Sequence, residues 1–199
     1  MFEFTKKLLF ARQLKLEKGS IEMLGQKMVI APVFTFSAMI KNANNSAAIA
    51  KVIYNACKTT NKDVQGFTYR VSKLYKAEDA ELIKLMASIA TMAGWGEINI
   101  FKVDAKKKTA VVHIHSSPVA QMIGSAKDPV DHPIRGYMAG AAEVIFNGLK
   151  RKEWELFDYI ETQCISNGSE FCEFVLDRRS NFEKSSDAKI RKLFRSQVT

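Results

Sequence analysis

The chain has 199 residues, of which 47% are hydrophobic and 26% are charged, and such a composition is typical of a soluble globular protein with an ample core. Its formal net charge of +9 permits contact with nucleic acid or an anionic membrane but demonstrates neither. The apolar runs are too short to span a membrane, and the first residues lack the apolar core of a signal peptide. We therefore expect a cytoplasmic protein whose cysteines stay reduced.

The first third of the chain predicts a helix, a small hairpin and further helices. Residues 1–12 have the pattern of a short amphipathic helix, and alternation over residues 14–25 is typical of a hairpin. A buried strand that gives way to a helix near Pro32 is predicted next. Beyond it, four apolar residues recur at helical spacing and predict a core-facing stripe: Ile49, Val52, Ile53 and Ala56. We assign residues 1–76 to an N-terminal part that packs on a core domain.

The middle of the chain contains a long helix and then a hairpin. Residues 78–93 place Leu82, Leu85, Met86 and Ile89 on one helical face, and Gly94 follows as a stop signal. Two alternating runs then flank a lysine-rich turn, which predicts an antiparallel hairpin over residues 94–117. A short helix is predicted over residues 116–124.

A second long helix should begin near Pro133, because proline is favoured in a first helical turn, and end at Asn147-Gly148. Gly136 and Gly140 lie four residues apart on it. They leave a flat strip where another backbone can approach closely.

Two cysteines lie in a segment that predicts two strands joined by Asn167-Gly168. A three-residue loop with a left-handed glycine would place Cys164 and Cys172 on the same side, whereas a two-residue loop would place them on opposite faces. Glu161 could join them if the strand ends or bulges there. Two thiolates and a carboxylate are acceptable zinc ligands, and the alternative is a pair of buried thiols in the core.

Separate hairpins and runs of helices predict an α+β fold. We divide the remainder of the chain into a core domain at residues 77–177 and a basic C-terminal tail at residues 178–199, the tail being a peripheral helix or disordered. No glycine-rich phosphate loop, nucleophile elbow or zinc-protease motif is present, and we expect no enzymatic activity.

Several short motifs follow one another in the core domain: "GWGEINI", "HSSPVAQMIG", "DPVDHPIRGYMAGAAEVIF" and the pattern E-x2-C-x3-G-x3-C-x-F. In this order they resemble the 4-vinyl reductase (4VR) domain family. The resemblance implies an antiparallel sheet of about four strands flanked by helices, as in the transport-particle (TRAPP) subunits, which dimerise through helices. It also implies a relationship to the sensor domains of phenol-responsive transcription activators, which bind an aromatic effector beside a structural zinc ion.

The resemblance further implies a zinc site. The ligands in those sensors are a cysteine five residues before the G-Y pair, and then the glutamate and cysteines of the E-x2-C-x7-C segment. Glu161, Cys164 and Cys172 match the last three positions, and Asp131 stands where the family has a cysteine. Asp131 could supply an oxygen ligand and His132 could replace it; otherwise either residue caps the helix at Pro133.

Five apolar or aromatic residues could line a ligand pocket or belong to the core, and only Tyr137 is carried over from the family: Trp95, Met122, Tyr137, Met138 and Phe146. We predict a non-enzymatic sensory domain for a small hydrophobic or aromatic ligand, with zinc, that signals through a homodimer or a protein partner. The alternative is a TRAPP-like dimerising scaffold without a small ligand. A nucleic-acid partner is not expected, whereas peripheral membrane contact is compatible with the basic surface.

Overall fold

The computed structural model describes residues 14–17, 20–23, 26–28, 33–43, 47–62, 66–126, 130–148 and 154–198. The chain divides into two compact units, residues 1–32 and residues 33–199. The sequence assigned residues 33–76 to an N-terminal part, but their helices belong to the same compact unit as the rest of the chain. The predicted helix over residues 1–12 lies outside the described residues.

The smaller unit contains a three-stranded antiparallel sheet of β1 (Leu14–Glu17), β2 (Ser20–Met23) and β3 (Gln26–Met28). β1 and β2 pair from Leu14 opposite Met23 to Glu17 opposite Ser20, which confirms the predicted hairpin. The strand predicted after residue 25 is therefore the third strand of this sheet, and it is only three residues long.

The larger unit is built on a four-stranded antiparallel sheet, which confirms the predicted α+β fold. Its strands are β4 (Glu97–Asp104), β5 (Thr109–His115), β6 (Phe157–Gln163) and β7 (Cys172–Arg178), in the spatial order β4-β5-β7-β6. Alternate residues of β5 and β7 are buried because successive side chains of a strand point to opposite faces. β6 is an outer strand, and its far edge is therefore not paired with another strand of the sheet.

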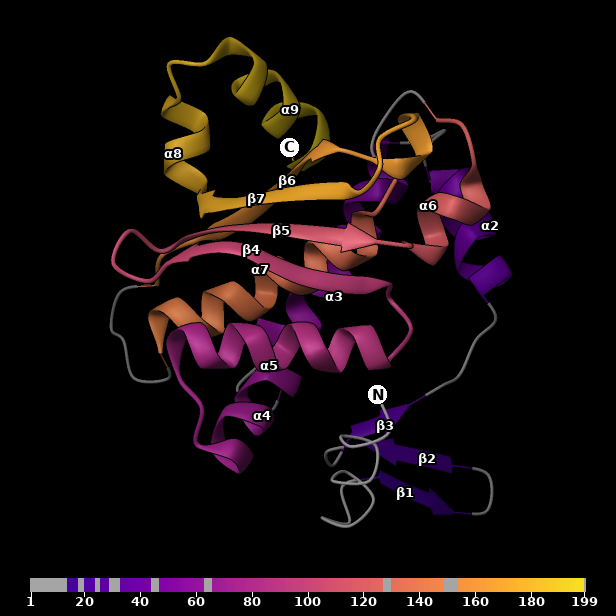
Figure 1. Ribbon diagram of the computed structural model, residues 1–199, viewed down its shortest axis with the longest axis vertical. Coiled ribbons are helices and arrows are strands. Elements are labelled where there is room, and N and C mark those ends of the chain that lie inside the picture. The colour runs from indigo at the N-terminus through magenta and orange to yellow at the C-terminus, as the bar shows by residue number, and fades with distance from the viewer. Residues whose placement is uncertain are drawn as a thin grey trace. The chain divides into compact units, whose positions relative to one another are not determined.

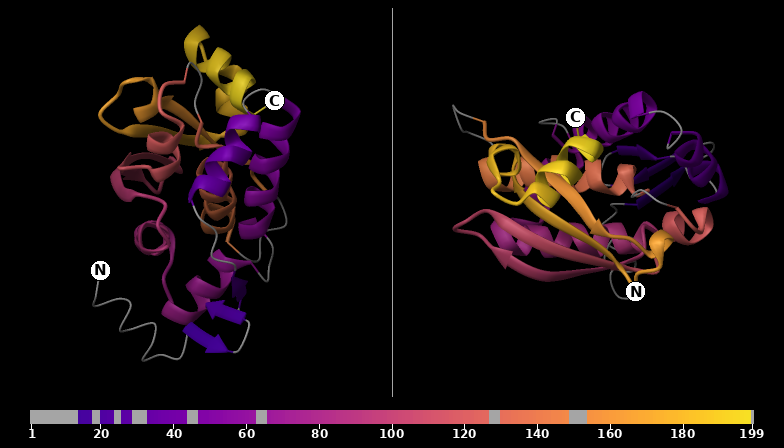
Figure 2. Two further views of the ribbon diagram at one scale, coloured as in Figure 1. Left: turned by 90° about the vertical axis from the view of Figure 1, so that its right-hand side faces the viewer. Right: turned by 90° about the horizontal axis from the view of Figure 1, so that it is seen from above.

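Helices pack against one face of this sheet and beside its β6 edge (Figures 1 and 2). α7 contacts both α3 and β6, and α5 contacts β4 and α7, whereas α8 contacts β7 and α9 contacts β6 and α3 beside the edge of the sheet (Figure 1). The helical elements are α2 (Val33–Ala43), α3 (Ala47–Lys62), α4 (Phe67–Tyr75), α5 (Asp79–Met92), α6 (Pro118–Ile123), α7 (His132–Asn147), the 3-10 turn η1 (Ile165–Asn167), α8 (Arg179–Lys184) and α9 (Ala188–Val198). None of these described helices is long and apolar enough to cross a membrane.

The contact between α3 and α7 depends on two glycines. A Cβ atom at Gly136 would collide with the backbone carbonyl of Tyr54, and one at Gly140 would collide with that of Lys58. The predicted close approach of another backbone is therefore confirmed, and the approaching backbone belongs to α3. This contact holds α7 between α3 and the sheet, with nearly every residue of α7 buried.

The predicted inward face of α3 is wrong. Ile49 and Val52 are 45% and 66% exposed, whereas Tyr54, Lys58 and Asn61 face inward and are buried. Polar residues occupy the buried face because they have charged or hydrogen-bonding partners there. Lys58 Nζ lies 2.8 Å from a Glu143 oxygen and 2.9 Å from an Asp158 oxygen.

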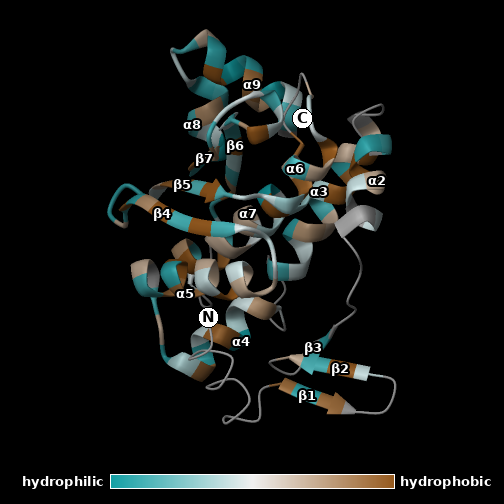
Figure 3. Cartoon of the chain, turned by 45° about the vertical axis from the view of Figure 1, so that its right-hand side comes forward, coloured by the Kyte–Doolittle hydropathy of each residue, from teal (hydrophilic) through white to brown (hydrophobic). Residues whose placement is uncertain are grey.

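The C-terminal tail, predicted to be a peripheral helix or disordered, forms two helices that pack on the sheet. α8 and α9 are largely hydrophilic (Figure 3). Their buried phenylalanines, Phe182 and Phe194, stack with ring centroids 5.4 Å apart. This apolar contact joins the two helices, and Gln197 extends the buried face of α9 toward its end.

Candidate functional site

The loop between β6 and β7 brings Cys164 and Cys172 together. Cys164 precedes η1 and Cys172 begins β7, and Gly168 ends the turn with a left-handed φ of +93°. The two Sγ atoms are 3.7 Å apart and both cysteines are fully buried. The prediction that they share a side is confirmed, although the connection contains a 3-10 turn and is longer than a three-residue loop.

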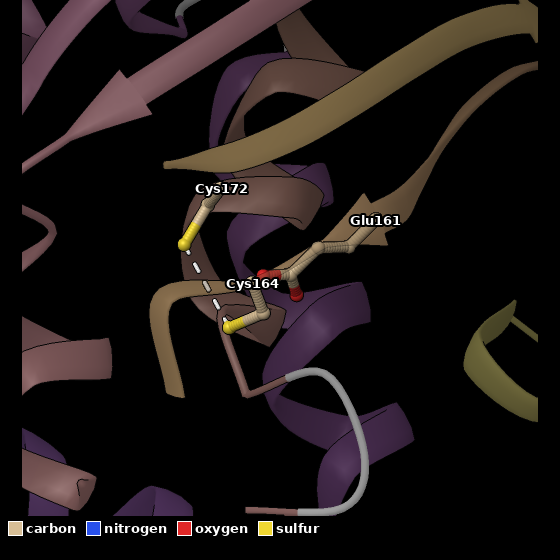
Figure 4. Close-up of side chains that lie close together, drawn as sticks. All are labelled: Glu161, Cys164 and Cys172. Carbon is tan, nitrogen blue, oxygen red and sulfur yellow. Dashed lines mark hydrogen bonds between the residues drawn. The ribbon is translucent and has the colours of Figure 1, made fainter. Parts of the chain in front are cut away.

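Glu161 joins the two cysteines through a β-bulge. It pairs with Phe174 while Gln163 pairs with Glu173, so the register shifts by one residue between them. The carboxylate of Glu161 and the two sulfur atoms all lie within 4.8 Å of one another (Figure 4). The sequence predicts that Glu161 can join the cysteines if the strand ends or bulges there, and the structure contains that bulge.

The carboxylate of Glu161 has no hydrogen-bond partner among the described residues. Both of its oxygens are buried, and the residue is only 1% exposed. Burial raises the pKa of this carboxyl well above its usual range, and the charges of Asp131 and Cys164 raise it further. A buried carboxylate without a partner is costly, and a bound cation would remove this cost.

The two thiols share a hydrogen bond that separates their pKa values. Donation from Cys172 lowers the pKa of Cys164 to about 5, and the same bond raises the pKa of Cys172. The Ser166 hydroxyl lies 2.9 Å from Cys164 Sγ, and the Ile165 N–H donates to Cys172 Sγ at 3.3 Å. One thiolate is thus already favoured, and thiolate is the form that ligates a metal.

Asp131 lies beside this group and does not cap the helix with its side chain. It occupies the N-cap position of α7 without making a side-chain capping bond, so the capping interpretation is wrong for Asp131. Its Oδ2 accepts a 2.9 Å hydrogen bond from Ser117. Burial, and then the charge of Cys164, raise the pKa of Asp131 to about 7.

The alternative fourth ligand, His132, is buried in the first turn of α7. Burial, and then the charge of Arg135, lower its pKa to about 3, so the imidazole is neutral at pH 7. Neither His132 nor Asp131 belongs to the tight group of ligand atoms formed by Glu161 and the two cysteines.

Arg135 lies one helical turn after Asp131 and is only 1% exposed. Burial lowers its pKa, while the charges of Tyr54, Glu161 and Asp131 favour its protonated form. The sequence analysis did not identify a role for Arg135, Ser117 or Gln197. In the structure, Ser117 contacts Asp131 and Gln197 contacts Arg135. Only the four-residue spacing between Asp131 and Arg135 on one helix hinted at their proximity.

A separate apolar cavity of about 40 Å³ lies between α5, α7 and the sheet. Tyr137 and Met138 line it, together with Ile83, Met86, Ala87, Ala90, Ile98, Ile100, Val112, Ala141, Ala142, Ile145 and Tyr159. The other three residues predicted for a pocket do not line this cavity. Met122 is 52% exposed on α6, Phe146 packs against Phe157, and Trp95 follows α5.

Tyr159 of β6 is a cavity residue that the sequence analysis did not identify. Strand alternation places it on the same sheet face as Phe157 and Glu161, which was the available signal. Burial raises the pKa of both Tyr137 and Tyr159.

The fold matches solved structures at low sequence identity. The phenol-responsive sensory domain of the transcription activator PoxR, crystallised with phenol, is 14% identical with a TM-score of 0.73, covering 100% of this chain and 98% of that chain. A trafficking protein particle complex subunit 3 from Naegleria fowleri, covalently bound to palmitic acid, is 10% identical with a TM-score of 0.53, covering 74% of this chain and 92% of that chain.

A vinyl-4-reductase family protein from Methanocaldococcus jannaschii is 18% identical with a TM-score of 0.49, covering 76% of this chain and 83% of that chain. No protein-family model and no curated protein matches the sequence. The chain therefore has the fold of the PoxR sensory domain and of the trafficking-complex subunit, which confirms the structural relationships predicted from its motifs.

Proposed function

We propose that this chain is a non-enzymatic sensory domain that binds a small hydrophobic ligand, an aromatic ring with a hydroxyl group, between α5, α7 and the sheet. The carrying observation is an apolar cavity whose lining includes two tyrosines, Tyr137 and Tyr159. An apolar site with a few polar groups that orient the ligand is the usual construction of a small-molecule site. The shared fold with a phenol-responsive domain supports this choice.

The volume of the cavity suggests how binding could produce a signal. One buried water needs roughly 10–15 Å³, so about 40 Å³ holds only a few atoms before its walls move. Met86 and Met138 have flexible side chains that can rotate to admit a ring. Binding would then favour a different position of α7, and differential affinity for two states is what a sensor requires.

Ligand binding is tested by thermal shift and calorimetry with phenol and toluene, two molecules of similar shape. We expect both to stabilise the protein and phenol to bind roughly 2- to 10-fold more tightly, the value of one hydrogen bond. Substituting phenylalanine at Tyr137 or Tyr159 should remove this preference if that hydroxyl makes the bond.

A matched pair of methionine variants locates the site. Met138→Ala enlarges the cavity and should change the affinity for phenol, whereas Met122→Ala, on the exposed face of α6, should not. No stabilisation by any small aromatic molecule would overturn the sensor. The scaffold without a small ligand would then be tested by measuring mass in solution.

We also propose that Glu161, Cys164, Cys172 and Asp131 hold a structural zinc ion. Support comes from the thiol pair, the unpartnered carboxylate of Glu161 and the donor types, since zinc accepts sulfur and carboxylate oxygen in tetrahedral sites. A bound ion would supply positive charge to this group and would join the β6–β7 loop to the start of α7.

The zinc site is tested by metal analysis of untagged protein purified under reducing conditions. We expect about one zinc per chain, lost in a Cys164→Ser/Cys172→Ser variant together with part of its thermal stability. Cys57→Ser is the matched control, because this cysteine lies on α3 outside the cluster. Well-folded wild-type protein that binds no zinc at micromolar concentrations would show that the cysteines are core thiols.

For output, we propose that the domain reports through a homodimer or a protein partner. Symmetric dimers are the commonest oligomers of soluble proteins. Light scattering with and without phenol measures this directly. A monomer at micromolar concentration in both conditions would exclude the homodimer and leave the protein partner.

A further inference from the structure

The side chain of Gln197, near the end of α9, pairs with the backbone of a candidate metal ligand. Its Oε1 accepts a 2.8 Å hydrogen bond from the N–H of Glu161, and its Nε2 donates a 2.9 Å hydrogen bond to the Glu161 carbonyl. β6 is an outer strand of the sheet, so no strand among the described residues pairs with these two backbone groups on that side. Gln197 supplies the pair of bonds that a neighbouring strand would otherwise provide.

Arg135 secures the same glutamine from α7. One guanidinium nitrogen donates to Gln197 Oε1 at 2.7 Å, and the other donates to the Gln197 backbone carbonyl. Gln197 is 8% exposed and Arg135 1% exposed, so this is an interior contact. Arg135 also lies where the charges of Glu161 and Asp131 act on it. The glutamine therefore connects α9 to two elements that carry candidate ligands.

Gln197 contacts β6 at Glu161, next to the point where the pairing of β6 with β7 is interrupted. The register shift after Glu161 turns this residue and Cys164 toward one centre, and a bulge interrupts the regular ladder. On the edge of β6 that faces away from β7, Gln197 hydrogen-bonds to the backbone N–H and C=O of Glu161. The direction of the Glu161 carboxylate thus depends on a residue 36 positions later in the chain.

We propose that the end of α9 is a latch on the metal site: Gln197 positions Glu161 as a ligand, so that metal binding and docking of α9 stabilise each other. The inference rests on the proposed zinc site. Coupling of two binding events is reciprocal, so a metal that needs Glu161 in place also favours the docked helix. The end of α9 lies beside β6 (Figure 1), and Glu161 is the candidate ligand to which Gln197 hydrogen-bonds.

The first experiment measures zinc affinity by competition with a chromophoric chelator, using the full chain. We expect Gln197→Ala to weaken zinc binding by about 10- to 100-fold, the range seen when a residue that orients a metal ligand is removed. Ser196→Ala, an exposed neighbour on the same helix, is the matched control and should bind like wild type. An unchanged affinity in Gln197→Ala would overturn the latch.

A double-mutant cycle separates positioning from general destabilisation. If Gln197 acts through Glu161, the loss caused by Gln197→Ala should largely disappear in a Glu161→Gln background. An equal loss in both backgrounds would show that the helix acts on the fold and not on the ligand. Wild-type protein without zinc affinity would instead refute the zinc site itself, so the two failures are distinguishable.

The reciprocal effect has its own readout. Trypsin can cleave at Lys189, Lys192 and Arg195, which lie on α9. Zinc should slow this cleavage in wild type. The factor should be about the ratio of the zinc affinities of wild type and Gln197→Ala, because the coupling is reciprocal. In Gln197→Ala, zinc should have little effect on cleavage. Equal protection of both proteins by zinc would contradict the latch.

Discussion

The Ser117 hydroxyl donates a 2.9 Å hydrogen bond to Asp131 Oδ2 while accepting one from the N–H of Ala120. Ser117 therefore caps α6 and at the same time binds the Asp131 carboxylate, which makes no side-chain capping bond to α7. Because the carboxylate does not cap its own helix, it is available to the cysteines. This relationship leaves Asp131 as the candidate fourth ligand of the proposed zinc site.

Variants of Asp131 should alter zinc affinity in opposite directions. Asp131→Ala removes a donor and should weaken zinc binding at least about 10-fold, whereas Asp131→Cys adds a thiolate and should strengthen it. Glu170→Ala, an exposed acid two residues before Cys172, is the control. Chelator competition measures all of these variants. Equal affinity of Asp131→Ala and wild type would remove Asp131 from the ligand set.

The metal-free protein should respond to pH in a way that Asp131→Asn reveals. The pKa of Asp131 rises from 3.8 to about 7 on folding, so its contribution to stability is present below pH 3.8 and is lost as pH rises to about 7. The free energy of unfolding of Asp131→Asn minus that of wild type should therefore increase between pH 4 and pH 7.

Denaturant unfolding at several pH values, with a chelator present, measures this difference. His132 has the opposite dependence, because its lowered pKa makes stability fall at low pH, but it affects both proteins and cancels in the comparison. Zinc should reverse the trend in wild type, since ligation requires the deprotonated groups. A difference independent of pH would contradict the raised pKa.

Gly140→Ala should destabilise the protein through the contact between α3 and α7. The added methyl group meets the carbonyl of Lys58, which belongs to a helix backbone and cannot rotate away. Overpacking of this kind costs roughly 1–3 kcal/mol. Urea unfolding measures the loss, and Asn55→Ala on the exposed face of α3 should stay within about 0.5 kcal/mol of wild type. Similar values for both variants would argue against the close packing.

Lys58→Met should destabilise the protein more than any exposed lysine substitution. Lys58 Nζ contacts Glu143, Asp158 and the Phe157 carbonyl within 2.9 Å, and both acids are fully buried. Asp158 keeps its ion pair with Arg179, but Glu143 loses the charge of Lys58, and breaking a buried ion pair costs roughly 3–5 kcal/mol. Lys84→Met, on the exposed face of α5, is the matched control in thermal unfolding. Equal melting temperatures would show that the buried acids are neutral.

Local patterns correctly predicted the elements whose ends are marked by proline, glycine or a turn. Proline near its start and glycine after its end delimited α7, and alternation around a lysine-rich turn predicted β4 and β5. The inward face of α3 could not be found this way. Periodicity shows where apolar residues recur, but Lys58 takes the buried face because its acidic partners come from α7 and β6.

The sequence by itself determined the α+β class and the identity of the candidate ligands Glu161, Cys164 and Cys172, because donor types and hairpin spacing are local properties. Only the tertiary structure decided that Glu161 turns toward the cysteines at a bulge and that Asp131 is held by Ser117. It also decided that Gln197 meets Glu161 from 36 residues away and Arg135 from 62. Such contacts depend on how separate elements pack, and no pattern within one element contains that information.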